Sequence, residues 1–309
     1  MLLSFARGGL YSCRMPQDAM PDPILDPVYD LTLPEAPLSC AVFSSPHSGR
    51  DYAKAYMGET RLAPRALRSS EDAFVDELFA AGPRAGAPLL AARVPRACVD
   101  LNRAPDDLDP ALISGAVRRF LNPRIAAGLG VIPRVVAEGR PILEGKLSLA
   151  EAQRRIDAYY QPYHARLRQL LDESRRRFGL AILFDCHSMP HDALASVPRN
   201  GGRLPDLVLG DRFGAACGSW LVEAATEIFS AQGFVVARNA PFAGGYITQT
   251  YGRPALGMHA LQIEVDRSLY MDEPRVERAP GFAGLRDRIG AAVAELARLG
   301  RRAAPIAAE

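Results

Sequence analysis

The chain has 309 residues, of which 48% are hydrophobic, and a formal net charge of +2 at pH 7. This length suits one large α/β domain or two at most, and so small a charge excludes the strong field that nucleic-acid binding needs. No apolar run approaches the roughly 18 residues of a membrane-spanning helix, so we expect no insertion into a membrane. The five cysteines are odd in number and lack CxxC spacing, so we expect no disulfide framework and a reducing, cytoplasmic environment.

The first part of the chain has little of the patterning that marks regular structure. Residues 1–22 lack a convincing signal sequence, and we expect a loose tail there, before a single domain over 23–309. The proline-rich stretch 21–37 predicts an extended arm that leads into a strand over 38–43. That strand and another over 180–184 are short apolar runs, which are typical of buried strands in an α/β sheet.

Further strands and helices are predicted along the rest of the chain. Apolar runs predict strands over 89–94, 97–101, 234–237 and 260–265. Apolar residues at helical spacing predict helices over 70–81 with Ser69 or Ser70 as the N-cap, over 148–178 with a kink at Pro162, over 213–232 and over 281–299. This alternation predicts a three-layer α/β fold, in which helices cover both faces of a mostly parallel, mixed sheet.

Two histidines follow the strands over 38–43 and 180–184. His47 lies in Ser45-Pro46-His47-Ser48-Gly49, and His187 lies in Phe184-Asp185-Cys186-His187-Ser188. Ligand sites of such sheets form at the carboxyl ends of the strands, where two imidazoles are natural ligands for a metal such as zinc. A lone histidine is more often structural than a ligand. Asp185 is either an acceptor that orients a histidine ligand or a simple turn residue.

A carboxylate interrupts the apolar strand over 260–265 at Glu264. Burial of that charge costs several kcal/mol unless a neighbouring group compensates it. Glu264 is therefore either one half of a buried ion pair with an arginine or a base with a raised pKa beside a metal site.

An amide and a guanidinium end the strand predicted over 97–101, at Asn102 and Arg103. Arginine binds a carboxylate in a bidentate fork, which suits recognition of an acidic substrate. The alternative is that Arg103 stabilises a turn with a nearby aspartate. Arg96 lies seven residues before Arg103 and is placed to reach the same cleft.

Taken together, these segments resemble the N-formylglutamate amidohydrolase family, which belongs to the wider group of zinc carboxypeptidases and aspartoacylases. The resemblance extends over about residues 38–273 and rests on the order and number of the matching segments. The segments are Ser45-Pro46-His47-Ser48-Gly49, Glu71-Asp72, Val99-Asp100-Leu101-Asn102-Arg103, Asp185-Cys186-His187-Ser188, Gly244-Gly245-Tyr246-Ile247-Thr248, Tyr251-Gly252, Leu261-Gln262-Ile263-Glu264 and Leu269-Tyr270-Met271.

The resemblance implies a zinc-carboxypeptidase-like fold with a site for zinc or another divalent metal. His47 and His187 resemble two of the ligands, and the family pattern gives Asp72 as the third. Zinc carboxypeptidases take their carboxylate three residues after the first histidine, a position that Arg50 occupies here. Glu71 and Asp51 therefore remain alternatives for the third ligand.

The remaining site residues also take their roles from the resemblance. Glu264 resembles the general base, and Arg96 resembles the arginine that polarises the scissile carbonyl. Asn102 and Arg103 resemble the pair that holds a substrate carboxylate, and Gly245 and Thr248 lie in a segment expected to bind substrate.

The family resemblance implies hydrolysis of N-formyl-L-glutamate to formate and L-glutamate, a step of histidine degradation. The alternatives are another N-acyl amino acid, a small peptide, or a non-catalytic protein that binds a small acidic ligand. Thr248-Gln249-Thr250 precedes Tyr251 here, where family members often carry Thr-Arg-His. If that arginine reads the glutamate side chain, Arg253 is the candidate to replace it.

Overall fold

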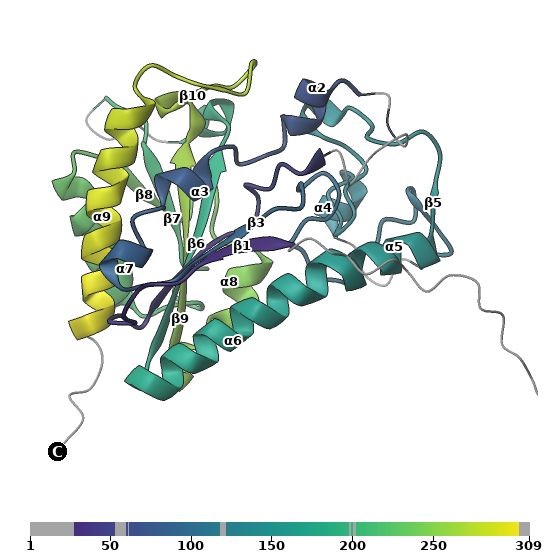
Figure 1. The fold of residues 1–309 in the computed structure, drawn as a ribbon. Coiled ribbons are helices and arrows are strands. Elements are labelled where there is room, and N and C mark those ends of the chain that lie inside the picture. Colours follow the sequence, from purple (N-terminus) through teal and green to yellow (C-terminus); the bar gives the residue numbers. More distant parts are fainter. Residues whose placement is uncertain are drawn as a thin grey trace, which may run out of the picture.

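A seven-stranded mixed sheet forms the centre of the computed structural model, which describes residues 28–52, 60, 62–117, 122–197, 199 and 202–302 (Figure 1). The tail predicted over 1–22 lies outside the described residues. The strands follow in the order β1 (Tyr29–Thr32), β3 (Leu89–Ala92), β2 (Ala41–Ser45), β6 (Ala181–Met189), β9 (Met258–Asp266), β7 (Leu207–Gly210) and β8 (Val236–Arg238). The four strands from β3 to β9 run parallel, whereas β1 on one side and β7 with β8 on the other run in the opposite direction. The prediction of a mostly parallel, mixed sheet is confirmed.

Helices cover both faces of this sheet and form the other two predicted layers (Figure 1). One apolar core lies between the sheet and α3 (Val75–Leu78), α7 (Ser219–Ala231) and α9 (Phe282–Arg302). A second core lies on the opposite face, against α6 (Gln161–Phe178) and α8 (Tyr246–Tyr251). The three-layer prediction is therefore confirmed.

The smaller elements complete the chain between these layers. They are α2 (Pro64–Arg68), α4 (Pro123–Ala126), α5 (Leu149–Arg155), a π-helical turn (Ile156–Tyr160), β4 (Ile113–Ser114), β5 (Leu147–Ser148), β10 (Met271–Asp272) and β11 (Glu277–Arg278). The π-helical turn joins α5 to α6 without a break, and Pro162 lies directly after it, at the start of α6. Among the described helices, none has the length and apolar character to cross a bilayer.

One face of the two longest strands, β6 and β9, changes from apolar to polar along their length. They pair over nine positions, which places Asp185 beside Gln262 and His187 beside Glu264. Side chains alternate between the faces of a strand, so these four lie on one face. That face is apolar where the strands begin and polar where they end, whereas the other face packs into the core with α9. The pairing therefore gathers polar side chains at the carboxyl ends of both strands.

The prediction of a strand over 97–101 is wrong, because this segment forms a turn. The backbone N–H groups of Cys98 and Val99 both donate to the carbonyl of Pro95, so the chain turns instead of extending. Asn102 and Arg103 thus follow an irregular segment, and β3 already ends at Ala92.

Two predicted helices are shorter than expected because positive backbone angles interrupt them. Phe74 has φ of 65°, and the helix predicted over 70–81 is reduced to α3. Arg212 and Phe213 have φ of 54° and 55°, so the helix predicted from residue 213 begins only at Ser219. The prediction also missed β1, within the proline-rich arm, and β7.

Candidate metal centre and catalytic site

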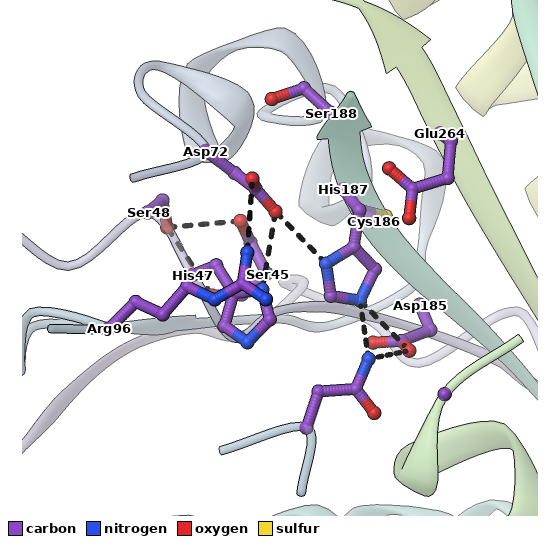
Figure 2. A network of polar contacts seen from close by, with 12 residues as sticks. Ser45, His47, Ser48, Asp72, Arg96, Asp185, Cys186, His187, Ser188 and Glu264 are labelled. Carbon is purple, nitrogen blue, oxygen red and sulfur yellow. Dashed lines mark hydrogen bonds and ion pairs between the residues drawn. The ribbon is translucent and has the colours of Figure 1, made fainter. Parts of the chain in front are cut away.

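Three side chains meet at the carboxyl ends of β2 and β6 (Figure 2). His47 follows β2, His187 lies near the end of β6, and Asp72 lies in the turn before α3. Oδ2 of Asp72 is 3.0 Å from Nδ1 of His187 and 3.3 Å from Nδ1 of His47, and the two ring centroids are 4.8 Å apart. All three residues are buried, and their ligand atoms are close enough to hold one metal ion.

The backbone around His47 is fixed by close contacts. The N–H of Asp72 donates to the carbonyl of His47 over 3.0 Å, which ties the turn before α3 to the end of β2. A Cβ atom on Gly49 would lie 1.9 Å from the carbonyl oxygen of Val94, so only glycine fits there. The Ser-Pro-His-Ser-Gly segment thus has a steric reason for its glycine.

The outer nitrogen of each imidazole faces a second carboxylate. Nε2 of His47 lies 2.7 Å from Oδ1 of Asp100, and Nε2 of His187 lies 3.0 Å from Oδ2 of Asp185. A carboxylate accepts hydrogen bonds, so each Nε2 carries a proton, which leaves Nδ1, on the side of Asp72, as the nitrogen that would bind a metal. Nδ1 of His47 is buried and has no hydrogen-bond partner, an arrangement that a cation between the three ligands would satisfy.

The charges around the three ligands favour a cation. Burial opposes protonation of His187, but Asp185 and Asp72 raise its pKa well above its ordinary value. Burial also opposes the charged form of Asp72, yet the two histidines and Arg267 hold its pKa well below its ordinary range. Two imidazole nitrogens and one carboxylate oxygen are the ligands of a catalytic zinc site with one open position.

Glu264 and Arg96 flank this cluster (Figure 2). Glu264 is beside His187 in the sheet, and burial raises its pKa to about 7, the range of an effective general base. Nε of Arg96 donates to Oδ2 of Asp100 over 3.1 Å, and its Nη1 lies 4.0 Å from Oδ1 of Asp72. A proton acceptor and a guanidinium thus lie on the two sides of the candidate metal position.

The two residues predicted to hold a substrate carboxylate are already engaged within the protein. Nδ2 of Asn102 donates to Oδ2 of Asp185 over 3.5 Å, and its Oδ1 accepts from the N–H of Ile247 over 2.8 Å. Arg103 donates from Nε to the carbonyl of Leu129 and from Nη1 to the carbonyl of Asn102, each over 3.0 Å. These two bonds use two of the five N–H donors of its guanidinium.

Gly245 and Thr248 are buried at the start of α8. The hydroxyl of Thr248 donates to the carbonyl of Gly245 over 2.9 Å, and the N–H of Gly245 donates to Oε1 of Gln262 over 2.8 Å. Arg253, the candidate replacement for the family arginine, donates instead to the carbonyls of Gln249 and Gly252. Its Nη1 therefore stabilises the end of α8.

The two alternatives for the third ligand are paired elsewhere. Glu71 accepts two hydrogen bonds from Arg68 and one from the hydroxyl of Tyr52. Asp51 accepts from Nε of Arg93 over 2.9 Å. Asp72 is the carboxylate that the structure brings to the histidines.

Sequence reasoning missed the role of Arg267. This residue is buried directly after β9, and its guanidinium reaches three segments of the chain. It donates to Oδ1 of Asp72 over 2.9 Å, to the hydroxyl of Ser188 over 3.2 Å and to the carbonyl of Ser69 over 3.4 Å. Arg267 thereby directs Oδ2 of Asp72 towards the histidines. Its position just after the carboxyl end of a strand was the only signal available in the sequence.

The chain is similar to proteins that act on N-formylglutamate. A family model described as N-formylglutamate amidohydrolase matches residues 39–271. The N-formylglutamate deformylases of Pseudomonas putida and Pseudomonas aeruginosa are each 34% identical to the chain over 236 residues, which cover 75% of it and 82% of each relative.

Similar structures have also been solved. The crystal structure of N-formylglutamate amidohydrolase from Ralstonia eutropha JMP134 has a TM-score of 0.81 and 38% sequence identity, and covers 89% of this chain and 98% of that one. A gene product from Agrobacterium tumefaciens, at 19% identity and a TM-score of 0.56 over 87% of this chain and 95% of that one, shares the fold.

Proposed function

Since the chain belongs to the N-formylglutamate amidohydrolase family, we propose that it hydrolyses N-formyl-L-glutamate to formate and L-glutamate with the help of zinc or another divalent metal. The observation that carries this proposal is the approach of two imidazole Nδ1 atoms to one oxygen of Asp72, beside a buried glutamate. His47, Asp72 and His187 would hold the ion. Bound there, it would supply Lewis acidity, which acidifies a water and polarises an amide carbonyl.

The protein's own groups would move the proton and stabilise the developing charge. Glu264, with a pKa raised by burial to about 7, accepts a proton from the attacking water and returns it to the leaving amine. Arg96 is fixed by Asp100 through Nε, which leaves its Nη donors to stabilise the oxyanion of the tetrahedral intermediate.

Substrate alignment falls to Arg103 and Asn102 in this proposal, with Gly245 and Thr248 shaping the same region. The remaining donors of the Arg103 guanidinium would bind the substrate carboxylate and so hold the amide in position for attack. We also propose one catalytic domain over 23–309, a cytoplasmic location and a role in histidine degradation, which rest on the sequence and the family resemblance.

Formate release from a panel of N-acyl amino acids tests the substrate. We expect zinc-loaded protein to hydrolyse N-formyl-L-glutamate faster than N-formyl derivatives of neutral amino acids and faster than N-acetyl or N-succinyl glutamate. Faster hydrolysis of another compound of the panel would support the hydrolase function but identify a different substrate. Binding of these acids without hydrolysis of any of them would instead identify a non-catalytic binding protein. A protein of that kind has no need of a buried base.

Replacement of Arg103 by lysine tests the substrate carboxylate. Lysine keeps the charge but loses the planar fork, so we expect kcat/KM for N-formyl-L-glutamate to fall by an amount equivalent to about 1–3 kcal/mol. The α-amide of the same substrate lacks that carboxylate and should be a poor substrate for both proteins, with no further loss in Arg103→Lys. Equal losses on both compounds would contradict the role and leave Arg103 as a support for its backbone partners.

A further inference from the structure

A buried carboxamide on β9 connects the proposed base to the start of α8. Gln262 lies two residues before Glu264, on the same face of the strand, and only 4% of its surface is exposed. Its Nε2 lies 2.8 Å from Oε1 of Glu264, and its Oε1 lies 2.8 Å from the backbone nitrogen of Gly245. Both ends of this side chain are therefore used.

The chemistry of the partners determines which end of the amide faces which partner. The backbone N–H of Gly245 can only donate, so the oxygen of Gln262 must face it. The nitrogen must then face Glu264 and donate to Oε1 of the carboxylate. The opposite orientation would place two donors against each other at Gly245 and bury two unmade hydrogen bonds. With Oε1 engaged in this way, Oε2 of Glu264 is left to exchange the proton.

The Gly245 end of this connection is itself held firmly. A Cβ atom on Gly245 would lie 2.5 Å from the amide atoms of Asn102, so the backbone lies directly against that side chain. Asn102 accepts from the N–H of Ile247, and its Nδ2 donates to Oδ2 of Asp185, the carboxylate oxygen that Nε2 of His187 also faces. The first turn of α8 is thus joined through Asn102 to Asp185, the partner of His187, and through Gln262 to the proposed base.

We infer that Gln262 is a positioning residue that holds the carboxylate of Glu264 in a fixed orientation relative to the metal ligands. The inference rests on the proposed hydrolase function. Without the amide, Glu264 keeps its place in the strand, but its side chain is free to rotate. The base is then poorly aligned with the attacking water, which lowers kcat, while substrate binding and KM change little.

Two substitutions separate the two hydrogen bonds of Gln262. Gln262→Glu keeps the acceptor for Gly245 but places an oxygen against Glu264, whereas Gln262→Met has similar length and loses both bonds. For zinc-loaded protein we expect both variants to lower kcat by roughly 10-fold or more, the scale of one hydrogen bond to a charged group, with KM changed less than about 3-fold. Amide hydrogen exchange at Gly245 should accelerate in Gln262→Met and stay near the parent rate in Gln262→Glu.

The matched control is Gln169→Glu on the exposed surface of α6. There the amide of Gln169 also donates to a carboxylate, Glu173, over 2.8 Å, so the same chemical change is made away from the site. The control should keep the parent kcat. A parent-like kcat in Gln262→Glu would overturn the inference, as would a loss confined to KM or a loss of zinc equal to the loss of activity.

Failure of the proposed function can be distinguished from failure of the inference about Gln262. If zinc-loaded parent protein releases no formate, the function is wrong, and the inference is then decided by the ¹³C resonance of the Glu264 carboxyl group. That resonance should move in Gln262→Glu and Gln262→Met and stay in place in Gln169→Glu. An unmoved resonance, or unchanged exchange at Gly245 in Gln262→Met, would overturn the inference whatever the activity.

Discussion

Replacement of Glu264 by glutamine is expected to lower kcat by roughly 10²-fold or more while zinc content and folding stay as in the parent. The two side chains have nearly the same shape, and the new amide can turn its oxygen towards Nε2 of Gln262, the present partner of Glu264. What the variant loses is the proton acceptor. Turnover of N-formyl-L-glutamate at saturating zinc, together with metal analysis of the same sample, measures this effect.

The control for this substitution is Glu227→Gln, which makes the same change on the exposed side of α7 and should leave kcat unchanged. Near-parent turnover in a zinc-loaded Glu264→Gln protein would refute the assignment of the base. Zinc lost together with activity would instead identify Glu264 as a metal ligand.

Replacement of Asp72 by asparagine is expected to weaken zinc binding by more than about 100-fold, the upper end of losses caused by changes outside the ligand sphere. Oδ2 of Asp72 is the oxygen that both Nδ1 atoms face, and asparagine removes the charge. Either orientation of the amide is unfavourable, because its NH₂ group would oppose Arg267 or face the metal position. Competition with a chelator of known affinity measures the loss, and activity should fall in parallel.

Asp76→Asn provides the comparison, because Asp76 lies in α3, four residues further on, and pairs with Arg50. It should bind zinc as the parent does. Parent-like zinc affinity in Asp72→Asn would contradict the three-ligand site. If Glu71→Gln lost zinc and Asp72→Asn did not, the metal site would be correct but its third ligand would be Glu71.

The sequence was most informative where a chemically distinctive residue follows or interrupts an apolar strand. His47, His187 and Glu264 could be selected because imidazole and carboxylate groups beside buried strands need a compensating partner. The parallel pairing of β2, β6 and β9 could be expected from the alternation of strands with helices, and it brings those three residues to one edge of the sheet.

Features that depend on distant pairing or on local turns could not be predicted in the same way. Asp100 and Arg267 are ordinary charged residues in the sequence, and only the tertiary structure places them against His47 and Asp72. Strands of four residues such as β1 and β7 carry too short a pattern to indicate their antiparallel direction. The 97–101 segment has strand-like composition, but the turn after Pro95 determines its path.

The nine-position pairing of β6 with β9 has a consequence for errors in folding. Shifting β9 by one residue against β6 would reverse the face of every side chain it carries. Glu264 would then enter the apolar core beneath α9, and Ile263 would take its place beside His187. Because a buried, unpaired carboxylate is costly, such a slipped sheet is unstable as well as unable to assemble the site. The residues proposed for catalysis thus also select the correct strand alignment. A substitution such as Glu264→Leu would remove the energetic penalty on the shifted alignment together with the proposed base.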